Sequence, residues 1–410
     1  MRAMRPLARR MGRLGTETAF EVLARARALE AQGRHIVHLE IGEPDFDTPK
    51  SVSAAGVAAI ERGETHYTPT AGVPELREAI AIYLNRARGL AVDPSQVIVA
   101  PGAKPIMFYA ILALIDHGDE AIFPDPGFPI YASMISFAGG TPISMPLREK
   151  NDFVPDLDEL RRLVTDKTKL IILNSPHNPT GGLLSKEAIR EIARIARERD
   201  IWVLSDEIYA ELIYDGEHHS IAREEGMAER TIILDGFSKT FAMTGWRLGY
   251  GAFPKTLVEP VTRLATNSVS CTATFTQRAG IVALSQRPPE VDEMRKAFRA
   301  RRDAIVAGLN KIEGISCRTP AGAFYVFPNI SGLGLGTAKT VADRVLQEAG
   351  VACLAGTAFG AVGEGHLRLS YANSLENLDL AVERIGDWAK TARSAPLPTA
   401  AGAQPPAKQQ

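Results

Sequence analysis

The sequence predicts an α/β protein: a large domain whose mostly parallel sheet is sandwiched by helices, joined to a smaller α+β domain. Between residue 51 and about residue 286, short apolar segments alternate with helical patterns, which is typical of a parallel sheet covered on both faces. Pro288-Pro289 interrupts this alternation, and a long charged amphipathic helix follows it. The length of 410 residues is also too great for a single hydrophobic core.

These observations divide the chain into four parts. The tail after about residue 392 is rich in Pro, Ala and Gln with almost no apolar bulk, so we expect it to be disordered. The expected parts are an N-terminal segment that packs with the small domain (1–50), the large domain (51–287), the small C-terminal domain (288–392) and the tail (393–410).

In the large domain, strands are predicted where apolar residues run without interruption, and helices where apolar residues recur every three or four positions. The predicted strands lie near 97–100, 120–123, 141–145, 170–174, 201–205, 231–235 and 248–252, and helices between them include 74–86, 105–115 and 186–199.

The remaining elements belong to the smaller domain. The long helix has an outer face rich in Arg and Glu, which indicates that this face is exposed. In chain order we expect a helix at 16–32, a strand at 36–41, a helix at 290–310, strands at 314–318 and 323–328, a helix at 338–349, strands at 351–355 and 366–371, and a helix at 374–392.

Charge and composition exclude several classes of function. The 47 Lys and Arg balance 48 Asp and Glu, and no dense basic cluster is present, so we expect no nucleic-acid partner. No apolar stretch is long enough to span a bilayer, and the basic start lacks the apolar core of a secretory signal. The three cysteines are scattered and the histidines form no ligand cluster, so we expect no metal site and a cytoplasmic location.

Lys239 carries the strongest indication of chemistry. It follows the predicted strand at 231–235, next to Ser238, and Arg247 lies eight residues further on. A lysine amine in an apolar pocket beside another cation loses its charge more readily, and it can then attack a carbonyl. An arginine with a nearby serine suits a phosphate. An aldehyde cofactor that carries a phosphate, such as pyridoxal phosphate, satisfies both demands, although a solvated loop lysine is the ordinary alternative.

Three further predicted strands end in polar residues. Asp206 follows one strand and could hold a pyridine nitrogen in its protonated form. A Pro-rich turn after another strand presents Asn178, and Ala103 and Lys104 open a helix after the third. Ligands of open α/β sheets bind beyond the carboxyl ends of the strands. Each of these segments alone is about as consistent with ordinary turn or capping chemistry as with a site, but together they favour a cofactor site.

The chain resembles the class I/II aminotransferases, which are fold-type I pyridoxal-phosphate enzymes, and it is similar to their bacterial aspartate/aromatic branch. The resemblance extends from Ile41 to Tyr371. It rests on four motifs: Asn-Pro-Thr-Gly at 178–181, Ser-Asp-Glu-Ile-Tyr at 205–209, Ser-Lys-Thr-Phe-Ala-Met-Thr-Gly-Trp-Arg at 238–247 and Arg-Leu-Ser at 368–370.

The resemblance implies a role for each residue around the cofactor ring. Lys239 would carry the cofactor covalently and then move a proton on the substrate, and Asp206 would pair with the ring nitrogen. Tyr209 and Asn178 would bond the phenolic oxygen of the ring. Phe128 would stack on the ring, at a position where relatives often have tryptophan or tyrosine.

At the phosphate, the resemblance implies the backbone N–H groups of Ala103 and Lys104, the hydroxyl of Ser238, and Arg247. Many relatives have a hydroxyl three residues before the lysine, where this chain has Gly236. Tyr67 matches a tyrosine that reaches the phosphate of the neighbouring subunit. The resemblance therefore implies a homodimer with shared active sites, although a surface loop aromatic is the alternative for Tyr67.

For the substrate, Arg368 matches the residue that binds the α-carboxylate in two parallel hydrogen bonds, and the backbone N–H of Gly42 would approach the same group. The implied reaction is a ping-pong exchange of an amino group between an L-amino acid and a 2-oxo acid. Leu112 occupies the region where some acid-preferring relatives carry a lysine. The neighbourhood is apolar, so an aromatic, aliphatic or broad-range amino donor is as plausible as aspartate. Its residues are Phe20, Met107, Phe108 and Leu112.

Two alternatives to this reaction stay open. A carbon–sulfur β-lyase on the same scaffold would use the same Lys239 and Asp206. A non-catalytic ligand-binding module is the other, but no residue of the expected catalytic set is missing from the sequence.

Overall fold

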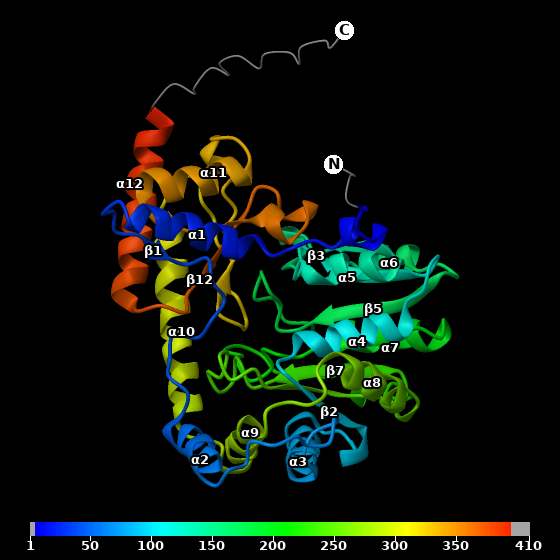
Figure 1. Cartoon of the computed structure of the whole chain (residues 1–410). Coiled ribbons are helices and arrows are strands. Elements are labelled where there is room, and N and C mark those ends of the chain that lie inside the picture. Colours follow the sequence, from blue (N-terminus) through cyan, green and yellow to red (C-terminus); the bar gives the residue numbers. More distant parts are fainter. Residues whose placement is uncertain (1–4, 395–410) are drawn as a thin grey trace.

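The structure is a computed structural model of the chain that describes residues 5–394 (Figure 1). Its centre is a seven-stranded sheet of order β2-β8-β7-β6-β5-β3-β4, in which β8 alone runs antiparallel to its neighbours. The mostly parallel sheet that the sequence predicts is therefore confirmed. The strands are β2 (Val97–Ala100), β3 (Glu120–Asp125), β4 (Thr141–Pro146), β5 (Thr168–Asn174), β6 (Trp202–Asp206), β7 (Thr231–Gly236) and β8 (Gly249–Ala252).

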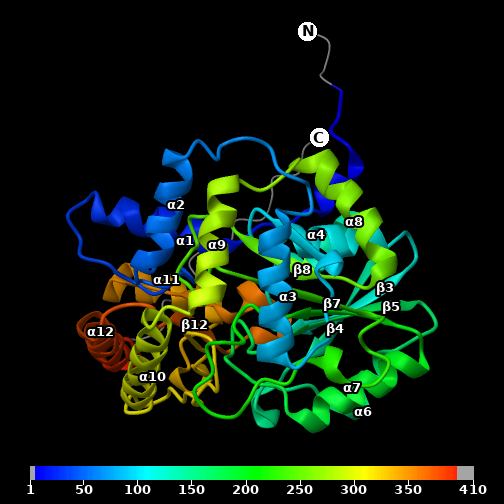
Figure 2. The same cartoon turned by 90° about the horizontal axis from the view of Figure 1, so that it is seen from below.

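Alternate residues of each strand point to opposite sides of this sheet. Because both sets are apolar, helices cover both faces. In β5, Leu170 and Ile172 pack against one set of helices, while Ile171 and Leu173 pack against another. The first face holds α4 (Lys104–Leu114), α5 (Ile130–Ala138) and α8 (Lys255–Ser268), and the second holds α3 (Pro74–Arg88), α6 (Leu157–Leu163), α7 (Lys186–Glu198) and α9 (Thr274–Gln286), against which α2 (Lys50–Glu61) packs (Figures 1 and 2).

A second hydrophobic core lies beside the large sheet. There, α10 and α12 pack side by side against two small sheets, of order β11-β12-β9 and β1-β10 (Figure 1). The elements are α1 (Thr18–Glu30), β1 (Val37–His38), α10 (Glu290–Leu309), β9 (Tyr325–Val326), α11 (Ala338–Arg344), β10 (Val351–Ala352), β11 (Leu354–Ala355), β12 (Leu367–Ser370) and α12 (Leu375–Ser394).

Short helical turns connect these elements. Their bounds are η1 (Arg9–Arg13), η2 (Pro94–Gln96), η3 (Glu149–Asn151), η4 (Ile221–Arg223), η5 (Ser331–Leu333), η6 (Val345–Ala349, a π-helical turn), η7 (Gly356–Phe359) and η8 (Ala361–Gly363).

Two predicted strands differ from the structure. The segment at 314–318 forms only an isolated bridge, between Ser316 and Asn329. The reason is that the Asn310 side chain bonds both backbone groups of Cys317, at 2.8 and 2.9 Å, and so takes the place of a neighbouring strand. The segment at 351–355 is two strands in two different sheets, because β10 pairs with β1 whereas β11 pairs with β12.

The predicted disordered tail falls outside the described residues, except that Arg393 and Ser394 belong to α12. Within residues 5–394, no helix has the length and apolar character needed to cross a bilayer. We retain as a proposal the division into a segment at 1–50, a large domain at 51–287 and a small domain at 288–392.

Candidate active site

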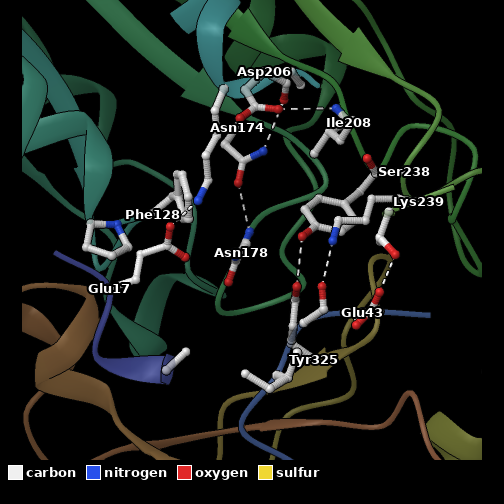
Figure 3. A pocket seen from close by; sticks show the side chains of 18 of the residues that line it. Glu17, Glu43, Phe128, Asn174, Asn178, Asp206, Ile208, Ser238, Lys239 and Tyr325 are labelled. Carbon is white, nitrogen blue, oxygen red and sulfur yellow. Dashed lines mark hydrogen bonds and ion pairs between the residues drawn. The ribbon is translucent and has the colours of Figure 1, made fainter. Parts of the chain in front are cut away.

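A cavity of about 480 Å³ lies where the carboxyl ends of the central strands meet the smaller domain. Side chains from β5, β6 and β7 and from the start of α4 line one side of it, and residues from the segment before α1, from β9 and from β12 line the other. Figure 3 shows how these side chains converge. The cavity brings together the predicted residues Gly42, Ala103, Lys104, Phe128, Asn178, Asp206, Tyr209, Ser238, Lys239, Arg247 and Arg368.

Lys239 follows the end of β7, and its side chain projects into the cavity (Figure 3). Its ammonium group donates a hydrogen bond of 2.6 Å to the carbonyl oxygen of Gly42 and lies 5.6 Å from the ring centre of Phe324. Burial lowers the pKa of Lys239 to about 8, with help from nearby cations such as Arg368 and against the opposing charge of Glu43. About a tenth of this amine is therefore uncharged at pH 7, far more than for an ordinary lysine, and the uncharged form is the nucleophile.

Asp206 ends β6 and lies fully inside the protein. Its carboxylate accepts a hydrogen bond from the Tyr131 hydroxyl at 2.6 Å. It also accepts one from the backbone N–H of Ile208 at 3.2 Å (Figure 3). Burial raises the pKa of Asp206 to about 6 despite these donors. A buried carboxylate of this kind is well suited to hold a cationic N–H group of a ligand.

Asn178 is held by the strand end that precedes it. The Asn174 side chain donates to the backbone carbonyl of Asp206 at 3.1 Å and accepts from the backbone N–H of Asn178 at 2.8 Å. The side-chain oxygen of Asn178 is buried without a hydrogen-bond partner. Because buried polar groups are almost always paired, this side chain indicates a position for a polar ligand atom.

Two aromatic residues flank the cavity. The Tyr209 hydroxyl shares a hydrogen bond of 2.8 Å with the hydroxyl of Tyr325, and burial raises the pKa of both phenols. Phe128 packs edge-on against Tyr131, with ring centres 5.7 Å apart. Both Tyr209 and Phe128 therefore present firmly held side chains to a ligand.

The start of α4 and Arg247 form the cationic end of the cavity. Ala103 stands at the N-cap of α4 without a side-chain cap, so the first N–H groups of this helix are available to an anion. The Arg247 guanidinium donates to the carbonyl oxygen of Thr244 at 2.9 Å. Gly102 is required here, because its φ is +93° and a Cβ atom would lie 2.1 Å from a nitrogen of Arg247.

Arg368, on β12, is buried and lines the cavity. Its guanidinium donates to the backbone carbonyl of Glu40 and lies 4.7 Å from the ring centre of Tyr325 and 4.9 Å from that of Phe359. The Nε atom of Arg368 has no partner in the structure. A buried cation with a free donor matches an anionic ligand group such as a carboxylate.

The residues 34–385 match the family described as "Aminotransferase class I and II". An aspartate aminotransferase of Pyrococcus horikoshii is 43% identical over 89% of this chain and 92% of its own length. The aromatic-amino-acid aminotransferase 2 of Thermococcus litoralis is 41% identical over 87% of this chain and 92% of its length. The structure of aspartate aminotransferase from Thermus thermophilus with maleate has a TM-score of 0.90 and 40% identity, and the match covers 94% of this chain and 100% of that chain.

The chain belongs to the class I and II aminotransferase family. It is an enzyme of the transaminase class with the fold-type I architecture, as the resemblance of its sequence implies. The family implies pyridoxal phosphate as the cofactor. The residues of the aminotransferase fit this group, because the unpaired Asn178 oxygen, the buried Asp206 and the partly uncharged Lys239 face one cavity with the cationic start of α4.

One prediction about the substrate pocket of this aminotransferase is wrong. Phe20 and Met107 line the cavity, but Phe108 and Leu112 do not. They pack within the core on the α4 face of the sheet, where the ring centres of Phe108 and Phe137 are 6.1 Å apart. The cation of this region is Lys104, whose side chain forms an ion pair with Glu17 and lies 5.4 Å from the ring centre of Phe128.

Tyr67 lies outside the cavity, and 91% of its side chain is exposed. Its predicted contact with a neighbouring subunit stays a prediction. Sequence reasoning missed several side chains that the structure brings to the site, among them Glu17, Tyr131, Asn174 and Tyr325. Of these four, only Asn174 had a signal in the sequence, because it ends a predicted strand four residues before Asn178.

Proposed function

We propose that this aminotransferase binds pyridoxal 5′-phosphate in the cavity, and that it exchanges an amino group between an L-amino acid and a 2-oxo acid. The proposal rests mainly on one observation: Lys239, with its pKa lowered to about 8, and the buried Asp206 line a single cavity with Arg368. When bound, the cofactor supplies an aldehyde that condenses with amino groups and a ring that accepts the electron pair of the substrate Cα–H bond.

Each residue of the cavity then has a defined task. Asp206 holds a proton at the ring nitrogen, and the amine of Lys239 takes the proton from the substrate α-carbon and returns it. Arg368 binds the α-carboxylate, and Gly42 borders the same group. This division of tasks keeps the substrate carboxylate and the proton carrier on neighbouring sides of the cavity, where Arg368 is close enough to lower the pKa of Lys239.

The remaining cofactor contacts come from both ends of the cavity. Asn178 and Tyr209 bond the phenolic oxygen of the ring, and Phe128 stacks on its face. The backbone N–H groups of Ala103 and Lys104, the Ser238 hydroxyl and Arg247 bind the phosphate. An anion at the start of α4 is stabilised by the unpaired N–H groups of the helix.

For the substrate, we propose a range that includes aspartate and aromatic amino acids. Two relatives carry the printed names aspartate aminotransferase and aromatic-amino-acid aminotransferase 2. The cavity supplies both kinds of contact, because the cation Lys104 lines it together with the apolar side chains of Phe20 and Met107.

We further propose a cytoplasmic homodimer in which Tyr67 of each protomer reaches the phosphate bound by its partner. The proposal is supported by the exposure of Tyr67 and of Val57 and Ile60 on the nearby helix α2. The three cysteines are unpaired, as is usual in a reducing compartment.

The test is a panel of amino acids mixed with the holoenzyme, in which amino transfer is followed by the change in cofactor absorbance and free ammonia is measured in parallel. Transfer to a 2-oxo acid without ammonia is the expected result. Ammonia release without transfer would instead indicate the β-lyase reaction. Borohydride reduction and peptide mapping should place the cofactor on Lys239, and an adduct on another lysine would contradict the assignment.

A further inference from the structure

Four cations line the cavity in the described part of the chain: Lys104, Lys239, Arg247 and Arg368. The proposed function gives the side chains of the last three a task, and it leaves the Lys104 ammonium group as the one that faces the substrate side chain. The structure provides this ammonium group with an anionic partner from the protein itself, because the carboxylate of Glu17 forms an ion pair with it.

The Glu17 side chain does not cap the helix that it precedes. Glu17 occupies the N-cap of α1, but its side chain makes no capping hydrogen bond. Asn, Asp, Ser and Thr are the residues that cap helices, since their short side chains reach the first N–H groups. The Glu17 side chain lines the cavity together with Phe128 (Figure 3).

The ion pair is accessible and can therefore break. The side chain of Glu17 is 20% exposed and that of Lys104 is 50% exposed. Partly exposed pairs of this kind contribute little, so a second carboxylate can replace Glu17 at Lys104 with a modest loss of binding.

We infer that Glu17 sets substrate preference by competing with the side-chain carboxylate of acidic substrates for Lys104. This inference rests on the proposed function. A neutral or aromatic side chain leaves the pair of Glu17 and Lys104 intact. An acidic side chain must first displace Glu17, so its apparent affinity equals its intrinsic affinity multiplied by the fraction of molecules in which Lys104 is free.

The experiment measures binding of two unreactive ligands to the holoenzyme by titration calorimetry. Maleate carries two carboxylates, and 3-phenylpropionate carries one carboxylate and an aromatic ring. Glu17→Gln should tighten maleate binding about fivefold, as expected for a partly exposed ion pair, and should leave 3-phenylpropionate unchanged. Glu17→Ala should behave in the same way. The matched control is Glu21→Gln, which removes an equal charge from the exposed face of α1 outside the cavity and should change neither affinity.

Lys104→Met separates competition from simple repulsion. In this background Glu17 has no cation to hold, so Glu17→Gln should no longer tighten maleate binding. Kinetics provide a second measurement, in which Glu17→Gln raises kcat/KM for aspartate about fivefold relative to phenylalanine.

Three outcomes would overturn the inference. Equal maleate affinity in the wild type and Glu17→Gln, with both ligands bound, would overturn the inference alone. A full effect of Glu17→Gln in the Lys104→Met background would show that Glu17 acts only by repulsion. A wild-type holoenzyme that binds neither ligand would overturn the proposed function together with the inference.

Discussion

The carboxyl group of Asp206 is held inside the protein at a cost in stability. Its pKa is about 6 in the folded protein, which is above the ordinary value of 3.8. The protonated form of such a group favours the folded state. Its contribution to the free energy of unfolding is complete below pH 3.8 and is lost as the pH rises from there through 6. At pH 8 the ionised Asp206 therefore destabilises the cofactor-free protein.

Asp206→Asn should raise the free energy of unfolding of the cofactor-free protein at pH 8 by roughly 1–2 kcal/mol, because it removes a buried charge. The same variant should lower turnover by roughly 10²-fold or more, because the ring nitrogen loses its charge partner. Denaturant unfolding and steady-state kinetics measure the two effects. Asp125→Asn is the control, since burial also raises the pKa of Asp125 but this residue does not line the cavity. Normal turnover of Asp206→Asn would show that another group pairs with the ring.

For Lys239 we predict a reactivity that increases as the pH rises. Its reactive form is the uncharged amine, and its pKa is about 8 rather than 10.5. The rate at which the cofactor-free protein takes up pyridoxal phosphate should rise about tenfold per pH unit below pH 8 and level off above it. Stopped-flow absorbance measures this rate. A midpoint near 10.5 would mean that burial does not lower the pKa of this amine.

At the scale of elements, helix α2 is fitted closely against the segment that carries Arg247. A Cβ atom added at Gly56 would lie 2.6 Å from the ring of Trp246, the residue before Arg247. The indole N–H of Trp246 donates to the Thr48 hydroxyl at 3.0 Å, and that hydroxyl donates to the carbonyl of Ala242 at 2.7 Å. The helix therefore needs a glycine where alanine would otherwise be favoured.

Gly56→Ala should destabilise the protein by about 1–3 kcal/mol through overpacking, and it should weaken phosphate binding by displacing Arg247. Denaturant unfolding and titration with pyridoxal phosphate measure these effects. Gly386→Ala in α12 is the matched control. A Cβ atom at Gly386 would meet Ile312 at an ordinary distance of 3.6 Å, so this substitution should stabilise the helix by roughly 0.5–1 kcal/mol. An equal increase in the free energy of unfolding of both variants would show that the close contact between Gly56 and Trp246 does not exclude a methyl group.

The elements that sequence reasoning found are those with a local signal. Buried parallel strands are continuous apolar runs, so the ends of β5, β6 and β7, and with them Asp206 and Lys239, could be located from the sequence. Contacts between distant segments have no such signal. Tyr209 and Tyr325 are 116 residues apart in the chain, and Glu17 and Lys104 are 87 apart.

The error at Leu112 has a geometric cause. Along α4, each residue rises about 1.5 Å, so Leu112 lies roughly 12 Å further from the start of the helix than Lys104 does. The cavity is at that start. The cation of the pocket is therefore Lys104, in the first turn of α4. The sequence had suggested only a backbone contact to the phosphate for this residue.

At the scale of the whole molecule, the proposed dimer gives a test by subunit mixing. Tyr67→Ala and Lys239→Ala protomers, each of low activity alone, should form hybrids with one site that carries both defects and one that carries neither. Random reassortment of equal amounts then recovers up to about a quarter of wild-type activity, given a two-fold interface. Mixing Arg368→Ala with Lys239→Ala is the control, since both residues line one cavity in the same chain. Activity that stays at the sum of the parents, with subunit exchange confirmed, would mean that each site is built from one chain.

The pairing of β1 with β10 also has a consequence during synthesis on the ribosome. Val37 lies beside Val351, and the last residue to join the cavity is Arg368. At about 5–20 residues per second, roughly 15–60 s separate the synthesis of these two strands. Throughout that interval the apolar residues of the first strand have no neighbouring strand to cover them. The nascent chain therefore carries Val37 and Leu39 without their partner strand long before it contains Arg368, the proposed binder of the substrate carboxylate.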